Sequence, residues 1–243
     1  MRMLIQKFMA VLLGFTMVAT SVLACSRALW NTNGHAVTVG RNMDWINNMP
    51  ADFFVIPRGI ERDGLVGTNS VKWKSKYGQL ALVREGAGVM DGVNEKGLAG
   101  HMLWLGTSDY GARDLTRPAM SLGVWLQYCL DNFGSVAEVA AAFEKDPFQI
   151  VTTKFDGMKA STHLAFEDST GDSVIIEYQN GKPKVYHSRK YTVMTNDPAY
   201  SKQLEKLANY KGFGGNDPLP GSSAAADRFV RAAYYLQGLP KAS

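Results

Sequence analysis

The chain has 243 residues, of which 46% are hydrophobic and 20% charged, and its formal net charge is +4. This composition can bury a sizeable core, and no block of Lys and Arg marks a surface for nucleic acid. Two cysteines exclude a disulfide-stapled scaffold, and the histidines show no metal-ligand spacing, standing at His35, His101, His163 and His187. We therefore expect a globular protein with no cofactor, no metal and no nucleic-acid partner.

The first 24 residues have the pattern of a secretory signal peptide. Arg2 and Lys7 form a positive head, an apolar run occupies residues 8–22, and a small-residue cleavage site ends at Ala24. The run is shorter than the roughly 20 uninterrupted apolar residues that a stable membrane span needs. We therefore expect export to the periplasm, with cleavage after Ala24 and no stable membrane span.

Cleavage after Ala24 makes Cys25 the first residue of the mature chain. An α-amine titrates at about 7.7 and a thiol at about 8.5, so this one residue carries a nucleophile and a base for its proton. That pair is the device of N-terminal nucleophiles and needs no histidine. Two other interpretations stay open on this evidence: an exported protein that merely begins with Cys, and a lipoprotein whose Cys carries the lipid.

Strand patterns dominate the first part of the mature chain. Residues 25–30 and 36–40 flank Asn33-Gly34, a hairpin turn signal, and a loop begins at residues 41–45. Further strands are predicted at residues 53–57, 79–83 and 98–105, with a turn at residues 91–97.

Two helices are predicted in the centre of the chain. Thr116 and Pro118 open the first, which ends near Asn132, because Pro is tolerated in a first turn. Residues 135–138 form a capping box for the second, which ends near Lys145. Beyond them we predict strands at residues 162–167, 173–178, 184–188 and 191–194, and helices at residues 199–210 and 224–236. This order indicates one α+β domain over residues 25–243.

A cysteine nucleophile that cleaves an amide needs groups that polarise its thiol and amine. Arg41 and Asp44 return toward Cys25 across the first hairpin. Asp44 can accept a hydrogen bond from the α-ammonium, and Arg41 can favour the thiolate. Taken alone, an Arg and an Asp at a strand end are more simply a surface ion pair.

Three further polar residues are candidates for the same site. Asn196 stands at a strand exit, where its amide N–H can serve an oxyanion hole, although an Asx turn before Pro198 also explains it. Asn94 stands in a predicted turn and Arg228 in the last helix, where a turn residue and a solvated charge are the ordinary explanations.

Together and in this order, the motifs resemble the choloylglycine hydrolase family of linear amide C–N hydrolases. They are Cys25, Arg41-Asn42-Met43-Asp44-Trp45, Gly92-Val93-Asn94-Glu95-Lys96-Gly97-Leu98, Met194-Thr195-Asn196-Asp197-Pro198 and Arg228-Phe229-Val230-Arg231. The resemblance implies a four-layer αββα sandwich with Cys25 as nucleophile and base. It implies that Arg41, Asp44, Asn196 and Arg228 are catalytic supports, with Asn94 a lesser candidate. It disfavours the lipoprotein, because lipid would block both thiol and amine.

Trp45 and Trp104 are candidates for a flat, apolar acyl pocket, although both can also be core residues. Trp104 stands where bile salt hydrolases have Asn, which is similar to Gram-negative penicillin V acylases and acyl-homoserine-lactone acylases. The resemblance implies an amidohydrolase that forms an acyl-enzyme from substrates of these two types, with conjugated bile salts as the alternative. Cys129 is expected to be a buried thiol without a disulfide to Cys25.

Family members usually continue past the helix that holds Arg228, with further strands and closing helices. If residue 243 is the terminus, we expect sheet edges that the family covers to stay open. The family commonly forms homotetramers through late segments, which leaves the oligomeric state open here. A truncated, non-catalytic or lipid-anchored relative is the alternative to an enzyme, and it predicts that Cys25 is modified or dispensable.

Overall fold

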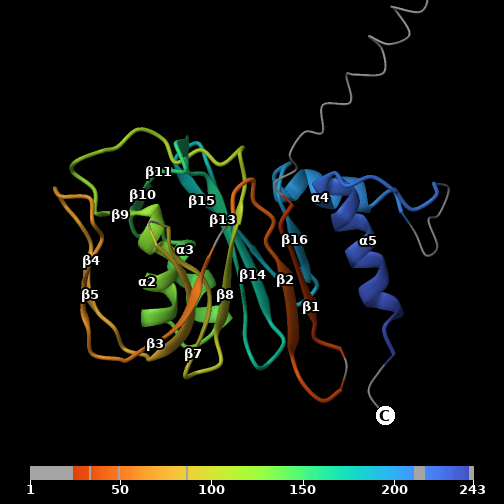
Figure 1. The fold of residues 1–243 in the computed structure, drawn as a ribbon, viewed down its shortest axis with the longest axis horizontal. Helices are drawn as coiled ribbons and strands as arrows, with labels where there is room; N and C mark the ends of the chain where they lie inside the picture. Colours follow the sequence, from red (N-terminus) through yellow and green to blue (C-terminus); the bar gives the residue numbers. More distant parts are fainter. Residues whose placement is uncertain (1–23, 33, 49, 86, 211–216, 241–243) are drawn as a thin grey trace, which may run out of the picture.

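The fold is a stack of two antiparallel sheets between two layers of helices (Figure 1). The computed structural model describes residues 24–32, 34–48, 50–85, 87–210 and 217–240, so the predicted signal peptide lies almost wholly outside the described residues. Helices α2 (Trp125–Asn132) and α3 (Val136–Phe143) cover the larger sheet, and α4 (Tyr200–Leu207) and α5 (Ala225–Gly238) cover the smaller one. The layers therefore follow the αββα order that the sequence resemblance implied.

The larger sheet has seven strands. Their order is β15 (Lys182–His187), β14 (Ser173–Gln179), β13 (Thr162–Glu167), β8 (Ala99–Trp104), β7 (Gly88–Asn94), β6 (Gln79–Arg84) and β3 (Asp52–Ile56). Strand β13 is buried along its whole length, because helices cover one face and the second sheet covers the other.

The smaller sheet has three strands, with β1 (Ser26–Trp30) between β16 (Val193–Thr195) and β2 (Thr38–Asn42). The remaining elements are short. They are the 3₁₀ turn Leu122–Val124, the pair β4 (Glu61–Asp63) and β5 (Lys72–Lys74), the parallel pair β9 (Ala119–Ser121) and β10 (Gln149–Val151), and the hairpin β11 (Lys154–Phe155) and β12 (Met158–Lys159). Among the described residues, no helix is both long and apolar enough to cross a membrane.

Two apolar clusters hold the layers together. One joins α2 and α3 to the larger sheet and includes Trp125 and Phe143. The other lies between the two sheets and under α4 and α5, and includes Tyr200, Phe229 and Cys25 itself. The start of β1 is therefore part of the packed core.

The structure corrects two predictions of secondary structure. The first helix begins at Trp125 and not at Thr116, because residues 119–121 pair in parallel with β10. The turn predicted at residues 91–97 begins later, since Asp91 lies within β7 directly opposite His101. The capping box of α3 is confirmed: the Ser135 side chain accepts from the Glu138 amide.

The larger sheet extends beyond the smaller one. Val55, Leu80 and Val93 lie side by side on β3, β6 and β7, and Val55 is 84% exposed. In the described part of the chain, β2 is the last strand of the smaller sheet on this side. In the described part of the chain, an apolar strip of the larger sheet is therefore uncovered here.

A substitution at Gly100 of β8 would test how tightly α2 packs on the larger sheet. A Cβ at this position would lie 2.7 Å from side-chain carbons of both Leu126 and Phe166, whereas a Cβ on Gly40 of β2 would meet nothing within 4 Å. We predict that Gly100→Ala lowers the free energy of unfolding by about 1–3 kcal/mol. Gly40→Ala should change it by less than about 0.5 kcal/mol. Urea unfolding of both variants measures this, and equal effects would contradict the close packing.

Candidate active site

Cys25 lies at the entrance to β1 and is buried, with 2% of its surface exposed. Its backbone nitrogen donates a hydrogen bond to Oδ1 of Asn196 at 2.7 Å, across 171 positions of sequence. Strand pairing brings the two together, because Ser26 of β1 lies opposite Thr195 of β16. The sheet register therefore sets the contact between two residues that the sequence singled out.

Arg228 of α5 holds this pair from the helical layer. Its Nη2 donates to Oδ1 of Asn196 at 2.9 Å and to the carbonyl oxygen of Cys25 at 3.1 Å, and its Nε donates to the hydroxyl of Ser26. Burial lowers the pKa of Arg228, while the charges of Cys25 and Asp44 raise it in part. Arg228 therefore forms hydrogen bonds beside the candidate nucleophile. It is not the solvated charge that its position in a helix alone suggested.

The side-chain oxygen of Asn196 accepts two hydrogen bonds, and its side-chain nitrogen donates one. Besides accepting from Cys25 and Arg228, it donates from Nδ2 to the carbonyl oxygen of Trp104 at 2.8 Å. An amide nitrogen carries two hydrogens, so within the described part of the chain one remains for another acceptor.

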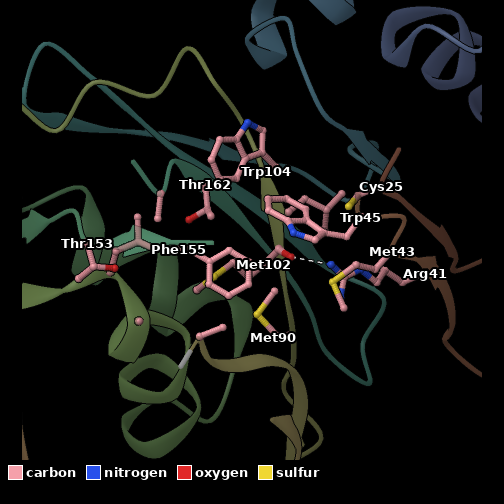
Figure 2. A pocket seen from close by; sticks show the side chains of 15 residues that line it. Cys25, Arg41, Met43, Trp45, Met90, Met102, Trp104, Thr153, Phe155 and Thr162 are labelled. Atoms are coloured by element: carbon pink, nitrogen blue, oxygen red, sulfur yellow. Dashed lines mark hydrogen bonds between the residues drawn. The ribbon is translucent and has the colours of Figure 1, made fainter. Parts of the chain in front are cut away.

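Arg41 and Asp44 follow each other around the end of β2 but differ in surroundings. The Arg41 guanidinium pairs with Asp91 and donates to the carbonyl oxygen of Met102 at 2.7 Å, the bond dashed in Figure 2. Its Nε is buried and has no hydrogen-bond partner among the described residues. Asp44 is exposed and accepts from Asn42 at 3.0 Å. Arg41 therefore lies inside the site, and Asp44 lies at its rim.

An apolar pocket opens beside Cys25. Trp45 forms its central wall, with its ring centre 5.4 Å from that of Trp104 and 5.3 Å from that of Phe155 (Figure 2). Three methionines also line it: Met43, Met90 and Met102. The pocket is suited to an apolar or aromatic group joined to a carbonyl that reaches Cys25.

A short hairpin fastens Trp45 in this wall. Asp156 stands in the turn between β11 and β12, and its carboxylate accepts the indole N–H of Trp45 at 2.8 Å. This bond lowers the pKa of Asp156. Neither Phe155 nor Asp156 is among the site residues predicted from the sequence. The pair Asp156-Gly157 is a hairpin signal, but only the fold shows that the turn reaches Trp45.

Asn94 corrects the sequence prediction, because it does not line the pocket. Its Nδ2 donates to the carbonyl oxygens of Leu130 and Phe133 at 2.9 and 2.8 Å, and its Oδ1 accepts from the amides of Lys96 and Leu98. These bonds tie the end of β7 to the end of α2. Asn94 is a structural residue.

Neither thiol is part of a disulfide, since Cys25 and Cys129 are both free. Cys129 is fully buried in α2, and burial raises the pKa of its thiol well above the usual range. In the described part of the chain, no group of His, Cys, Asp and Glu side chains is arranged to hold a metal ion.

Comparisons with known proteins find relatives over most of the chain. A family model for linear amide C–N hydrolases, choloylglycine hydrolase family, matches residues 25–243. Over 240 residues the chain is 40% identical to penicillin V acylase of Pectobacterium atrosepticum; the match covers 94% of this chain and 64% of that protein. This chain therefore spans a little under two thirds of that relative.

Solved structures show the same fold. Penicillin V acylase from Agrobacterium tumefaciens superposes with a TM-score of 0.82 at 42% identity, over 90% of this chain and 67% of that one. A variant of conjugated bile acid hydrolase from Clostridium perfringens superposes with a TM-score of 0.74 at 24% identity, over 88% of this chain and 72% of that one. The second likeness concerns the fold alone.

The burial of Cys129 leads to a labelling prediction. Because its thiol is enclosed and its pKa is raised, we expect no alkylation of Cys129 by iodoacetamide in the folded protein at pH 8. Alkylation should be complete in denaturant. Peptide mass spectrometry measures both states, and equal labelling in the two would contradict the described packing of α2.

Proposed function

Because this chain belongs to the choloylglycine hydrolase family of linear amide C–N hydrolases, we propose that it is an exported amidase with Cys25 as its N-terminal nucleophile. The observation that carries the proposal is the contact of the Cys25 nitrogen with Asn196, braced by Arg228, beside an apolar pocket. Removal of the predicted signal peptide, residues 1–24, converts this nitrogen into an α-amine. The site then has a base, a nucleophile and an acyl pocket.

The proposed reaction proceeds through a thioester. The α-amine of Cys25 takes the proton from its own thiol, and the thiolate adds to the carbonyl carbon of the substrate. The free N–H of Asn196 donates to the oxyanion. The C–N bond then breaks, and the leaving nitrogen takes the proton from the α-ammonium. Water, deprotonated by the same amine, hydrolyses the thioester and releases the carboxylic acid.

Charged residues have separate tasks in this proposal. Arg228 fixes Asn196 and the Cys25 carbonyl through its guanidinium. Arg41 brings a positive charge to the pocket and stabilises the thiolate. Asp44, at the rim, accepts from the α-ammonium once residues 1–24 are removed.

The pocket favours substrates with an aromatic or extended apolar acyl group. Trp45, Trp104 and Phe155 suit the flat ring of a phenoxyacetyl group, and the name of the 40% identical relative supports penicillin V as substrate. Acyl-homoserine lactones are the second candidate, because the methionines can repack around a linear chain. A steroid would require a wider cleft, so conjugated bile salts are the least favoured class.

The test is release of primary amine by the protein that results from expression of the full chain. We expect its mass to show an unmodified start at Cys25 and its turnover to fall at least about a thousandfold in Cys25→Ala. Penicillin V, an acyl-homoserine lactone and glycocholate are assayed in parallel, and Cys129→Ala is the matched control that retains activity. Turnover retained in Cys25→Ala would refute the nucleophile. A folded protein inactive on all three would favour a non-catalytic relative.

The bond between Asp156 and Trp45 predicts a change in substrate binding. Asp156→Ala removes the acceptor of the indole N–H, so the wall of the acyl pocket loosens and KM for the preferred substrate rises about tenfold. Asp156→Asn keeps an acceptor oxygen and should change KM less than threefold. Steady-state kinetics of both variants measure this, and an unchanged KM in Asp156→Ala would contradict the role of the hairpin.

A further inference from the structure

Two arginines lie directly opposite each other in the smaller sheet. Arg27 of β1 pairs with Arg41 of β2, so both side chains leave the same face, and both are buried. Like charges in this position repel each other, and the interior screens them poorly. The larger sheet supplies one carboxylate for each: Glu167 of β13 accepts from Nε of Arg27 at 3.1 Å, and Asp91 of β7 pairs with Arg41.

His101 of β8 joins the two carboxylates. Its Nδ1 lies 2.6 Å from Oδ1 of Asp91, and its Nε2 lies 2.6 Å from Oε1 of Glu167. Ionised carboxylates only accept hydrogen bonds, so both ring nitrogens must donate, which only the imidazolium can do. Five side chains form a row of alternating charge between the sheets, called here the charge row. Its members are Arg27, Glu167, His101, Asp91 and Arg41.

The surrounding charges agree with this protonation state. Burial by itself lowers the pKa of His101, but Glu167 and Asp91 outweigh it and raise the pKa to about 9. Burial likewise raises the pKa of Glu167, while His101 and Arg27 hold it at about 2. At neutral pH the row therefore carries three positive and two negative charges in strict alternation.

We propose that His101, as the imidazolium, is a positioning residue that holds Asp91 and thereby fixes Arg41 in the pocket of Cys25. The inference rests on the proposed function, which gives Arg41 its task beside the nucleophile. Apart from Asp91, the guanidinium has one described contact, the Met102 carbonyl, and its Nε is unpartnered. A neutral His101 would present a lone pair to a carboxylate oxygen 2.6 Å away and push Asp91 or Glu167 from its place.

The test compares His101→Gln with His187→Gln in a Cys129→Ala background. His187 lies in the same large sheet and also contacts a carboxylate at 2.6 Å, that of Asp172, but it is more exposed and outside the charge row. At pH 7.5 we expect His101→Gln to lower kcat about tenfold with little change in KM, and His187→Gln to change neither. Alkylation of Cys25 by iodoacetamide should slow about fivefold in His101→Gln alone, because Arg41 no longer stabilises the thiolate.

The pH dependence of stability and of kcat/KM distinguishes a charged, positioning His101 from a His101 that only fills space. The folded pKa of His101 lies above its unfolded value, so its stabilisation is complete below about pH 6.5 and is lost as the pH rises through about 9. The stability advantage of the wild type over His101→Gln in urea should therefore shrink between pH 6.5 and 9. Over the same range the kcat/KM of the wild type should approach that of the variant.

Unchanged kcat and an unchanged alkylation rate in folded His101→Gln would overturn the proposal. If that variant does not fold, NMR titration of histidine-labelled wild type decides: a pKa for His101 above 8 supports the proposal, and one at or below 6.5 overturns it. If neither protein turns over any substrate, the proposed function fails. The rate of Cys25 alkylation then still decides the role of His101, because it requires no turnover.

Discussion

The arrangement of the site depends on the central position of β1 in the smaller sheet. Because β1 pairs with β16 on one side and β2 on the other, the Cys25 backbone meets Asn196 from one neighbour, and Arg41 comes from the other. The helical layer then adds Arg228 from above. A slip of β1 by one residue would turn every one of its side chains to the opposite face and separate these groups.

Burial of charge between two sheets is the second constraint. Five ionisable side chains lie where a sandwich normally packs apolar residues. Such a row is tolerated because each charge has an opposite neighbour and a hydrogen bond, whereas removal of one member leaves a buried charge uncompensated. The charge row ends at Arg27 on β1 and at Arg41 beside the pocket. The buried charges between the two sheets therefore reach the proposed active site.

The pocket beside Cys25 combines residues fixed on strands with wall residues from a loop and a short hairpin. The Asn196 side chain accepts a hydrogen bond from the backbone nitrogen of Cys25 and donates one to the backbone carbonyl of Trp104, at the end of β8. Trp45 and Phe155, by contrast, come from a loop and a two-residue strand, and Asp156 accepts a hydrogen bond from Trp45. Side chains on loops are held by fewer contacts than side chains on central strands, so this wall is the more adaptable part of the pocket.

Most of the large sheet could be predicted from the sequence. Residues 162–167 and 173–178 are apolar runs bounded by turn residues, and these local patterns coincide closely with β13 and β14. The parallel pair β9 and β10 was missed, because its hydrogen bonds join short segments 30 positions apart that have no strand pattern of their own. Asp91 was assigned to a turn for a similar reason: its partners Arg41 and His101 lie on other strands.

The sequence by itself determined the family, through the ordered motifs that begin at Cys25 and end with Arg228. It also pointed to the residues proposed for the reaction, because together and in this order they resemble the motifs of that family. Only the tertiary structure decided that Asn94 braces a turn, that Asp156 fastens Trp45 and that His101 lies between two carboxylates. These roles depend on contacts between distant strands and loops, and one-dimensional patterns do not record which side chains those contacts bring together.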